Sequence, residues 1–153
     1  MWRRRDPNYE RSNAVLDIPI AIGAQARLLT VQLLASGDAL MRQRLGLALL
    51  DELTEAAQIN ICHLKVYDAP QAHRHRGSRM VYKKYGHYQP KTKGILIYNR
   101  TAVRGQILAP KSFLETLLHE WVHHYDFEKL KLNSIHTSGF YSRLNGLKAR
   151  LVQ

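Results

Sequence analysis

The chain has 153 residues, 45% of them hydrophobic, which fits one globular domain of ordinary size. A chain of this length can bury a core without disulfides, and its single cysteine, Cys62, excludes both a disulfide framework and a four-cysteine zinc site. Lysine and arginine total 23 against 12 acidic residues, for a net charge of +11. That charge favours polyanions such as nucleic acid as partners, and a purely solubilising surface is the alternative.

The N-terminal residues 1–13 are polar and carry a basic cluster, which predicts a flexible extension before a folded domain over residues 14–153. The segment lacks the apolar run of a signal peptide, and no window of the chain reaches 18 uninterrupted apolar residues. We therefore expect no membrane partner and a reducing, cytoplasmic setting. The sequence does not indicate an oligomeric state.

Two helices are predicted in the first third of the chain, over residues 24–35 and 39–57. Between them, Gly37 can take a left-handed cap conformation and Asp38 can cap the second helix. The apolar face expected for the second helix comprises Met41, Leu45, Ala48, Leu49 and Leu53.

The middle of the chain is predicted to form a small, mostly antiparallel sheet. Residues 61–67 are apolar and β-branched, which indicates a strand, and a basic loop follows over 71–79. Residues 80–88 and 95–100 indicate two further strands, joined as a hairpin by the turn at 90–94.

Two more helices are expected, over residues 112–131 and 138–151. Ser112 and Glu115 have the spacing of a capping box for the first of them. The second carries an apolar stripe of Phe140, Leu144, Leu147 and Leu151. Helices, then strands, then helices predict an α+β domain.

The helix predicted over 112–131 contains His119-Glu120-Trp121-Val122-His123. Histidines four residues apart lie one turn above each other, so both rings can bind one zinc ion. Glu120 follows the first ligand directly and can act as the base that accepts a proton from zinc-bound water. His124 points about 100° away from that face and is expected to be structural or exposed, not a ligand.

A catalytic zinc needs three protein ligands and one open position. A third histidine six residues after His123 is excluded, because that position is Lys129. A glutamate on the next helix is also excluded, since residues 129–153 contain no acid. His136 is the remaining candidate, with an ordinary loop histidine as the alternative. The expected cofactor is one Zn²⁺ per chain, held by His119, His123 and His136.

Further residues are candidates for supporting roles. Tyr141 and Tyr125 can supply a donor to a developing oxyanion, with Tyr141 preferred because it lies closer to His136 in the sequence; packing is the alternative for both. Glu115 and Asp126 are candidates to orient the ligand rings, with capping or surface roles as the alternative.

Lysines interleave with aromatic residues over 82–88, a pattern that can clamp single-stranded nucleic acid. The candidate contacts are Arg74, Arg76, Lys83 and Lys84. A half-exposed strand with its tyrosines packed on the domain is the alternative.

The run Leu117–His124, followed by His136-Thr137-Ser138-Gly139-Phe140-Tyr141, resembles the SprT-like family of zinc metallopeptidases, which includes DNA–protein crosslink proteases. The resemblance covers about residues 94–150. That family often has glycine where this chain has Thr137.

The resemblance implies a compact zincin-like domain with His119, His123 and His136 as ligands and Glu120 as the catalytic residue. It also implies an extended substrate lying beside the strand that contains Gly94, Ile95, Leu96, Ile97 and Tyr98.

The motif and the resemblance together predict a zinc metalloendopeptidase that acts on a protein or peptide, with DNA-associated proteins as one candidate class of substrate. The alternatives are a basic nucleic-acid-binding module with a non-catalytic zinc site, and a zinc hydrolase of a non-peptide substrate. A catalytic base beside the ligands favours an enzyme, because a structural zinc site needs none.

Overall fold

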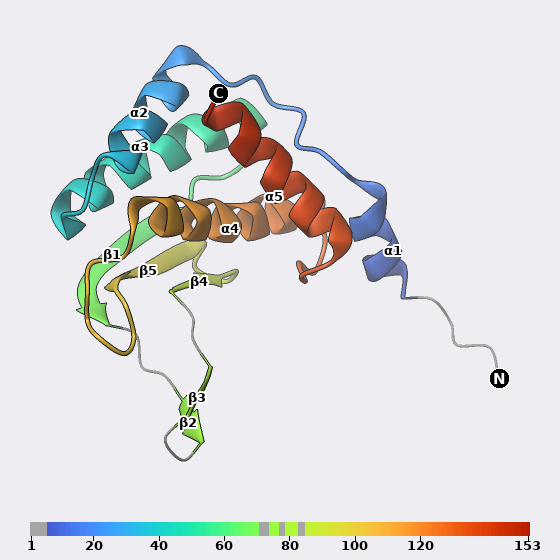
Figure 1. The fold of residues 1–153 in the computed structure, drawn as a ribbon. Coiled ribbons are helices and arrows are strands. Elements are labelled where there is room, and N and C mark those ends of the chain that lie inside the picture. Colours follow the sequence, from blue (N-terminus) through green and yellow to red (C-terminus); the bar gives the residue numbers. More distant parts are fainter. Residues whose placement is uncertain (1–5, 71–73, 77–78, 83–84) are drawn as a thin grey trace.

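The computed structural model of the chain describes residues 6–70, 74–76, 79–82 and 85–153, and for 74–76 and 79–82 it describes the backbone alone. Helices precede and follow the strands, which is the predicted α+β order (Figure 1). The described elements are α1 (Pro7–Ala14), α2 (Ala24–Leu34), α3 (Ala39–Ala57), β1 (His63–Pro70), β2 (Arg74–Arg76), β3 (Arg79–Tyr82), β4 (Gly86–Gln89), β5 (Gly94–Arg100), α4 (Pro110–Glu128) and α5 (Ser138–Leu151).

Helices α2 and α3 lie where the sequence predicts them. Asp38 caps α3 as expected, because its side chain accepts a hydrogen bond of 3.0 Å from the Met41 amide. Gly37 does not take the left-handed conformation; α2 ends earlier, at Leu34, with Ala35 as its C-cap. Met41 was expected in the core and is 42% exposed, because it lies on the opposite side of α3 from the buried Leu50.

The sheet is mixed rather than mostly antiparallel, with strand order β1-β5-β4. β1 pairs in parallel with β5, and β4 pairs antiparallel with β5. The hairpin expected around residues 90–94 is confirmed, but its first strand is short. β2 and β3 form a separate two-stranded ribbon. β2 lies in the region predicted as a basic loop, and the single strand predicted over 80–88 is divided between β3 and β4.

Helix α4 lies on the sheet and joins it to the other helices (Figure 1). It starts at Pro110, which suits a first helical position because proline has no amide hydrogen to leave unpaired. The predicted Ser112–Glu115 capping box does not form, since the helix already begins two residues earlier. Trp121 is fully buried and its indole donates to Thr54 on α3. The core of the domain therefore surrounds the helix that carries the histidine motif.

His124 lies on a different face of α4 from His119 and His123 and is structural rather than exposed. The ring is fully buried; Nδ1 lies 2.8 Å from the Tyr88 hydroxyl and Nε2 lies 2.7 Å from the Asn60 carbonyl. A carbonyl only accepts, so Nε2 carries the proton and Nδ1 accepts from Tyr88. Burial lowers the pKa of His124, in keeping with a neutral ring. These bonds fix α4 against β4.

The N-terminal segment is more ordered than predicted. Residues 1–13 were expected to be flexible, but Pro7–Ala14 forms α1, capped by the side chain of Asp6. Figure 1 shows α1 beside the start of α5, with the following segment running along α5 toward α2. Polar composition misled the prediction, because α1 is held by hydrogen bonds more than by apolar burial.

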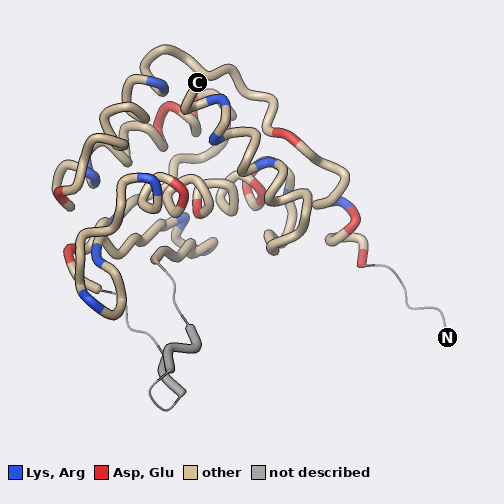
Figure 2. The backbone as a smooth tube through the Cα atoms, in the orientation of Figure 1, with Lys and Arg blue, Asp and Glu red and all other residues tan. Residues whose placement is uncertain are grey.

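Charged residues are spread over the surface that the structure describes. Figure 2 shows Lys and Arg on several helices and on the loop after β5, with Asp and Glu among them. Lys83 and Lys84 lie outside the described residues, as do the side chains of Arg74 and Arg76. Every helix in the described part of the chain is too short or too polar to cross a membrane.

Candidate metal centre

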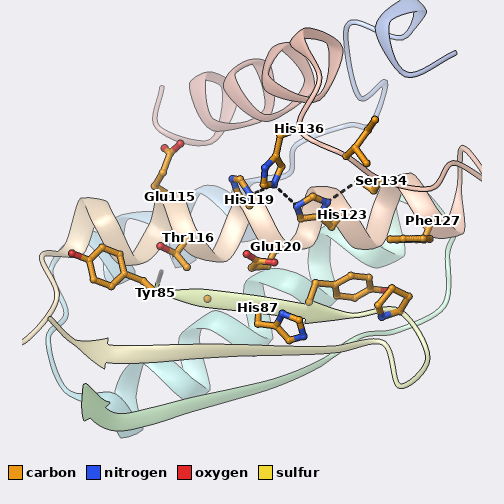
Figure 3. Close-up of a pocket in the computed structure, with 14 residues that line it drawn as sticks. Tyr85, His87, Glu115, Thr116, His119, Glu120, His123, Phe127, Ser134 and His136 are labelled. Carbon is orange, nitrogen blue, oxygen red and sulfur yellow. Dashed lines mark hydrogen bonds between the residues drawn. The ribbon is translucent and has the colours of Figure 1, made fainter. Parts of the chain in front are cut away.

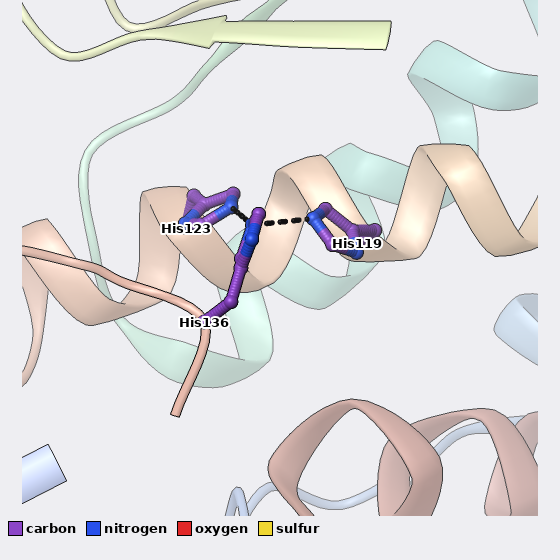
Figure 4. A group of neighbouring side chains, drawn as sticks. All are labelled: His119, His123 and His136. Atoms are coloured by element: carbon purple, nitrogen blue, oxygen red, sulfur yellow. Dashed lines mark hydrogen bonds between the residues drawn. The ribbon is translucent and has the colours of Figure 1, made fainter. Parts of the chain in front are cut away.

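Three histidine rings converge at one point on the exposed side of α4 (Figure 4). His119 and His123 stand one helical turn apart, and Nε2 of each lies 3.0 Å from Nε2 of His136. His136 comes from the segment between α4 and α5, so two separate parts of the chain form the cluster. The predicted set of ligands is thus brought together.

The spacing of the nitrogen atoms fits a tetrahedral metal ion. Zinc–nitrogen bonds of about 2.0–2.1 Å place two nitrogens of a tetrahedral site about 3.3 Å apart. The 3.0 Å separations are close to that value, and all three rings present the same atom, Nε2. His136 is exposed, and His119 and His123 are partly buried, so the cluster borders both solvent and the cleft that these three residues line.

The chain reverses sharply to bring His136 back to the helix. Lys131 takes a left-handed conformation with φ 54°, and the Leu132 amide donates to the Asp126 carbonyl across the turn. The helix was expected to extend to residue 131, whereas α4 ends at Glu128. Buried Leu132 then anchors the returning segment.

A hydrogen-bond relay fixes the ring of His123. Its Nδ1 lies 2.7 Å from the Ser134 hydroxyl, which donates to Asp126 Oδ2 at 2.8 Å. A carboxylate only accepts, so Ser134 uses its proton there and receives the proton of Nδ1. His123 is therefore held with Nδ1 protonated and the Nε2 lone pair available to a metal.

Asp126 was predicted to orient a ligand ring, and the structure places it one hydroxyl away from His123. Its carboxylate also receives Arg143 Nε at 3.0 Å and Nη2 at 2.8 Å, and both side chains are fully buried. Burial raises the pKa of Asp126, while the hydrogen bonds and charge of Arg143 oppose the rise. Neither Ser134 nor Arg143 was found from the sequence.

Phe140 forms the apolar floor of the histidine cluster. Its ring is fully buried and stacks on His123, with centroids 4.5 Å apart. It also meets His119 and His136 edge-on or tilted, at 4.9 Å and 5.3 Å. Phe140 was predicted to lie in the core, and this core residue also contacts the rings of all three candidate ligands.

Glu120 lies at the base of a cleft of about 830 Å³ between α4, β4 and the segment that carries His136 (Figure 3). Its side chain is buried and reaches the cleft beside His119 and His123. Gly86 on β4 makes this approach possible. A Cβ at Gly86 would lie 2.5 Å from Thr116 Cγ2 and 3.3 Å from Glu120 Cγ. The close contact of β4 with α4 thus requires glycine, which has no side chain, at position 86.

Among the supporting candidates, Tyr141 lies nearest to the cluster. Its ring centroid is 5.9 Å from that of His136 and 6.3 Å from that of His119, and the side chain is 43% exposed. Tyr125 is buried against Trp121. Glu115 lines the cleft and forms an ion pair with Lys148 on α5.

The strand predicted to lie beside a substrate is not available for that role. β5, which contains Gly94, Ile95, Leu96, Ile97 and Tyr98, is the central strand and pairs with β1 on one side and β4 on the other. Its edges are already occupied, so the prediction is wrong. β4 is the strand that lines the cleft (Figure 3).

Comparison of the chain with models of known protein families, with curated proteins and with solved structures gave no match.

Proposed function

We propose that the protein is a zinc-dependent metalloendopeptidase with one Zn²⁺ per chain, bound by His119, His123 and His136. The observation that carries the proposal is a cluster of three histidines, in which Nε2 of His136 lies 3.0 Å from Nε2 of both His119 and His123, in the same cleft as Glu120. An all-histidine ligand set with an open fourth position is typical of catalytic zinc. We also propose a zincin-like arrangement, in which the motif helix packs on a small mixed sheet.

When bound among the three imidazoles, zinc supplies a Lewis acid that polarises a carbonyl and lowers the pKa of water. Glu120 then acts as the general base, accepts the water proton and returns it to the leaving amine. Its place between the ligand helix and β4 gives the carboxylate access to the cleft without making it a ligand. Tyr141 is our candidate to stabilise the charge that develops on the carbonyl oxygen, because its exposed ring borders the cluster.

The substrate in this proposal is an extended peptide that lies along β4. The Tyr98 amide donates to the Tyr85 carbonyl, so residues 85, 87 and 89 pair with β5 in the antiparallel alternation. The backbone groups of Gly86 and Tyr88 therefore face away from β5. An extended chain can add to such an edge through main-chain bonds, which tolerates many side chains.

Nucleic acid remains a candidate partner because of the net charge of +11. A protease that acts on DNA-associated proteins combines both readings, with Arg74, Arg76, Lys83 and Lys84 as candidate contacts. The rival reading is a nucleic-acid-binding module whose metal site has no catalytic role. A third reading is hydrolysis of a non-peptide substrate at the same centre.

The test is Glu120→Gln in the purified protein, with metal content and casein hydrolysis measured on the same preparation. We expect one zinc per chain to remain and hydrolysis to fall by at least about a hundredfold, since general-base catalysis contributes about 10²–10⁴. Glu55→Gln, an exposed position on α3, is the matched control and should leave both unchanged. Unchanged hydrolysis in Glu120→Gln would remove Glu120 from the mechanism, and a wild-type protein that binds zinc but cleaves no peptide would favour the rival readings.

A further inference from the structure

His136 stands on a non-helical segment, yet hydrogen bonds from α1 hold the chain on both sides of it. Before His136, Asn8 makes a paired contact with Asn133: its Nδ2 donates to the Asn133 carbonyl at 2.8 Å, and its Oδ1 accepts from the Asn133 amide at 2.9 Å. Arg11 donates to the Leu130 carbonyl at 2.8 Å. Side chains of α1 thus form the hydrogen bonds that a helix or strand would otherwise provide to the backbone of Leu130 and Asn133.

After His136, α1 holds the first turn of α5. Asn13 Oδ1 accepts from the Ser138 hydroxyl at 2.9 Å and from the Gly139 amide at 2.8 Å. The Ser12 hydroxyl lies 2.7 Å from Oγ1 of Thr137, the residue that caps α5. A Cβ at Gly139 would collide with the Ser12 carbonyl, so the two backbones touch directly.

Arg143 connects the same helix to the second ligand. Its Nη1 donates to the carbonyls of Ser12 and Val15, both at 2.6 Å, and Nη2 reaches the Ser12 hydroxyl at 3.1 Å. On its other side Arg143 binds Asp126, which receives the Ser134 hydroxyl that holds His123. A hydrogen-bonded network therefore connects α1 to His123, and the Ser12–Thr137 contact connects α1 to the residue beside His136.

We propose that α1 is a clasp that sets the affinity of the metal centre, with Asn8 and Asn13 as positioning residues for His136. This inference rests on the proposed metal site. Without the clasp, the segment before α5 samples many conformations, and metal binding must order it at a cost in affinity. When α1 is bound in this way, His136 is already in position. The free energy needed to order its segment is then part of folding and does not lower metal affinity.

The test compares Co²⁺ affinity and the visible absorption of bound Co²⁺ in the full-length wild type, Asn8→Ala/Asn13→Ala, Asn13→Ala and Asn13→Asp. Asn13 acts only as an acceptor, so an aspartate retains both bonds and also carries a charge favoured at the start of α5. Asn145→Ala, an exposed position on α5, is the matched control.

We expect the double variant to bind Co²⁺ about tenfold to a hundredfold more weakly, as is usual when groups that orient metal ligands are lost, and its tetrahedral absorption to weaken. Asn13→Asp and Asn145→Ala should match the wild type, and all metal-free variants should retain the wild-type far-UV circular dichroism. Equal Co²⁺ affinity in wild type and double variant would overturn the clasp. If the double variant does not fold, Asn13→Ala against Asn13→Asp decides, and equal affinities overturn the proposal. A wild type that binds no Co²⁺ would overturn the metal site itself and the clasp with it.

Discussion

The Ser134 hydroxyl lies 2.7 Å from Nδ1 of His123 and thereby leaves Nε2 as the nitrogen of that ring that faces His136. The His123 ring belongs to α4, and the Ser134 hydroxyl belongs to the segment between α4 and α5. The same short segment also carries His136. The orientation of the His123 ring and the position of His136 therefore depend on a single conformation of residues 129–137.

Ser134→Ala should weaken metal binding with little effect on folding. The change removes the acceptor for the Nδ1 proton of His123 and leaves the ring free to rotate or change tautomer, which typically lowers metal affinity about tenfold or more. Zinc affinity is measured by competition with a chromophoric chelator. Ser142→Ala, exposed on α5, is the control. Equal zinc affinities in the two variants would show that the relay does not support the ligand.

Asp126→Asn should destabilise the whole protein. It leaves the fully buried Arg143 without its anionic partner, and breaking a buried ion pair from one side costs about 3–5 kcal/mol. The free energy of unfolding is measured with urea in the metal-free state, so that lost metal binding does not contribute. A double variant, Asp126→Leu/Arg143→Met, should recover part of the loss; a single-variant effect below about 1 kcal/mol would contradict a structural role for the pair.

Gly86→Ala should lower peptide hydrolysis while leaving metal content unchanged. The added methyl group meets Thr116 Cγ2 at 2.5 Å, so β4 must move away from α4 and from Glu120. Adding Thr116→Ser removes that methyl group and should restore part of the activity. Gly37→Ala is the control, because its new Cβ meets only Ile107 at 3.7 Å. No rescue by the second change would mean that the clash does not set the position of β4.

Cys62 should be unreactive in the folded protein. Its thiol should also make the free energy of unfolding fall as the pH rises above 9.0. Burial raises its pKa from 9.0 to about 11. A thiol whose pKa is higher when folded than when unfolded loses fewer protons in the folded state, so stability falls as pH rises from 9.0 toward about 11. Unfolding free energies of wild type and Cys62→Ala between pH 8 and 11 test this; the wild type should lose stability more steeply. Parallel curves would contradict the assigned pKa.

Removal of zinc should lower the melting temperature without unfolding the protein. The core forms around Trp121 and its neighbours and does not need the metal, whereas ligand binding adds stability by mass action, about 4 kcal/mol at a thousandfold excess over Kd. Calorimetry with chelator and with restored zinc measures the difference. Loss of the far-UV circular dichroism on chelation would instead identify a structural metal.

Local signals in the sequence predicted much of the fold and the site. Asp38 and the apolar period of α3 predicted that helix with the observed bounds, Ala39–Ala57. The histidine pair follows from helical spacing, and His136 followed from the exclusion of other ligands. The cluster could thus be predicted because the number and type of ligands that zinc requires are set by its chemistry and do not depend on the topology of the fold.

Other features depend on contacts between distant parts of the chain and had no local signal. The parallel pairing of β1 with β5 joins strands separated by a ribbon and another strand, so the central place of β5 could not be predicted. α1 buries only Ser12, and its asparagines find partners more than a hundred residues away. Ser134 and Arg143 acquire their roles in the same way, through a turn that no motif marks.

The most direct measurement is a crystal structure of the zinc-loaded protein with anomalous diffraction at the zinc edge. The account predicts one anomalous peak per chain, about 2.0–2.1 Å from Nε2 of His119, His123 and His136, with the fourth position facing the cleft that holds Glu120. A peak elsewhere, or one that the ring of His136 does not reach, would contradict the proposal that His119, His123 and His136 together bind zinc.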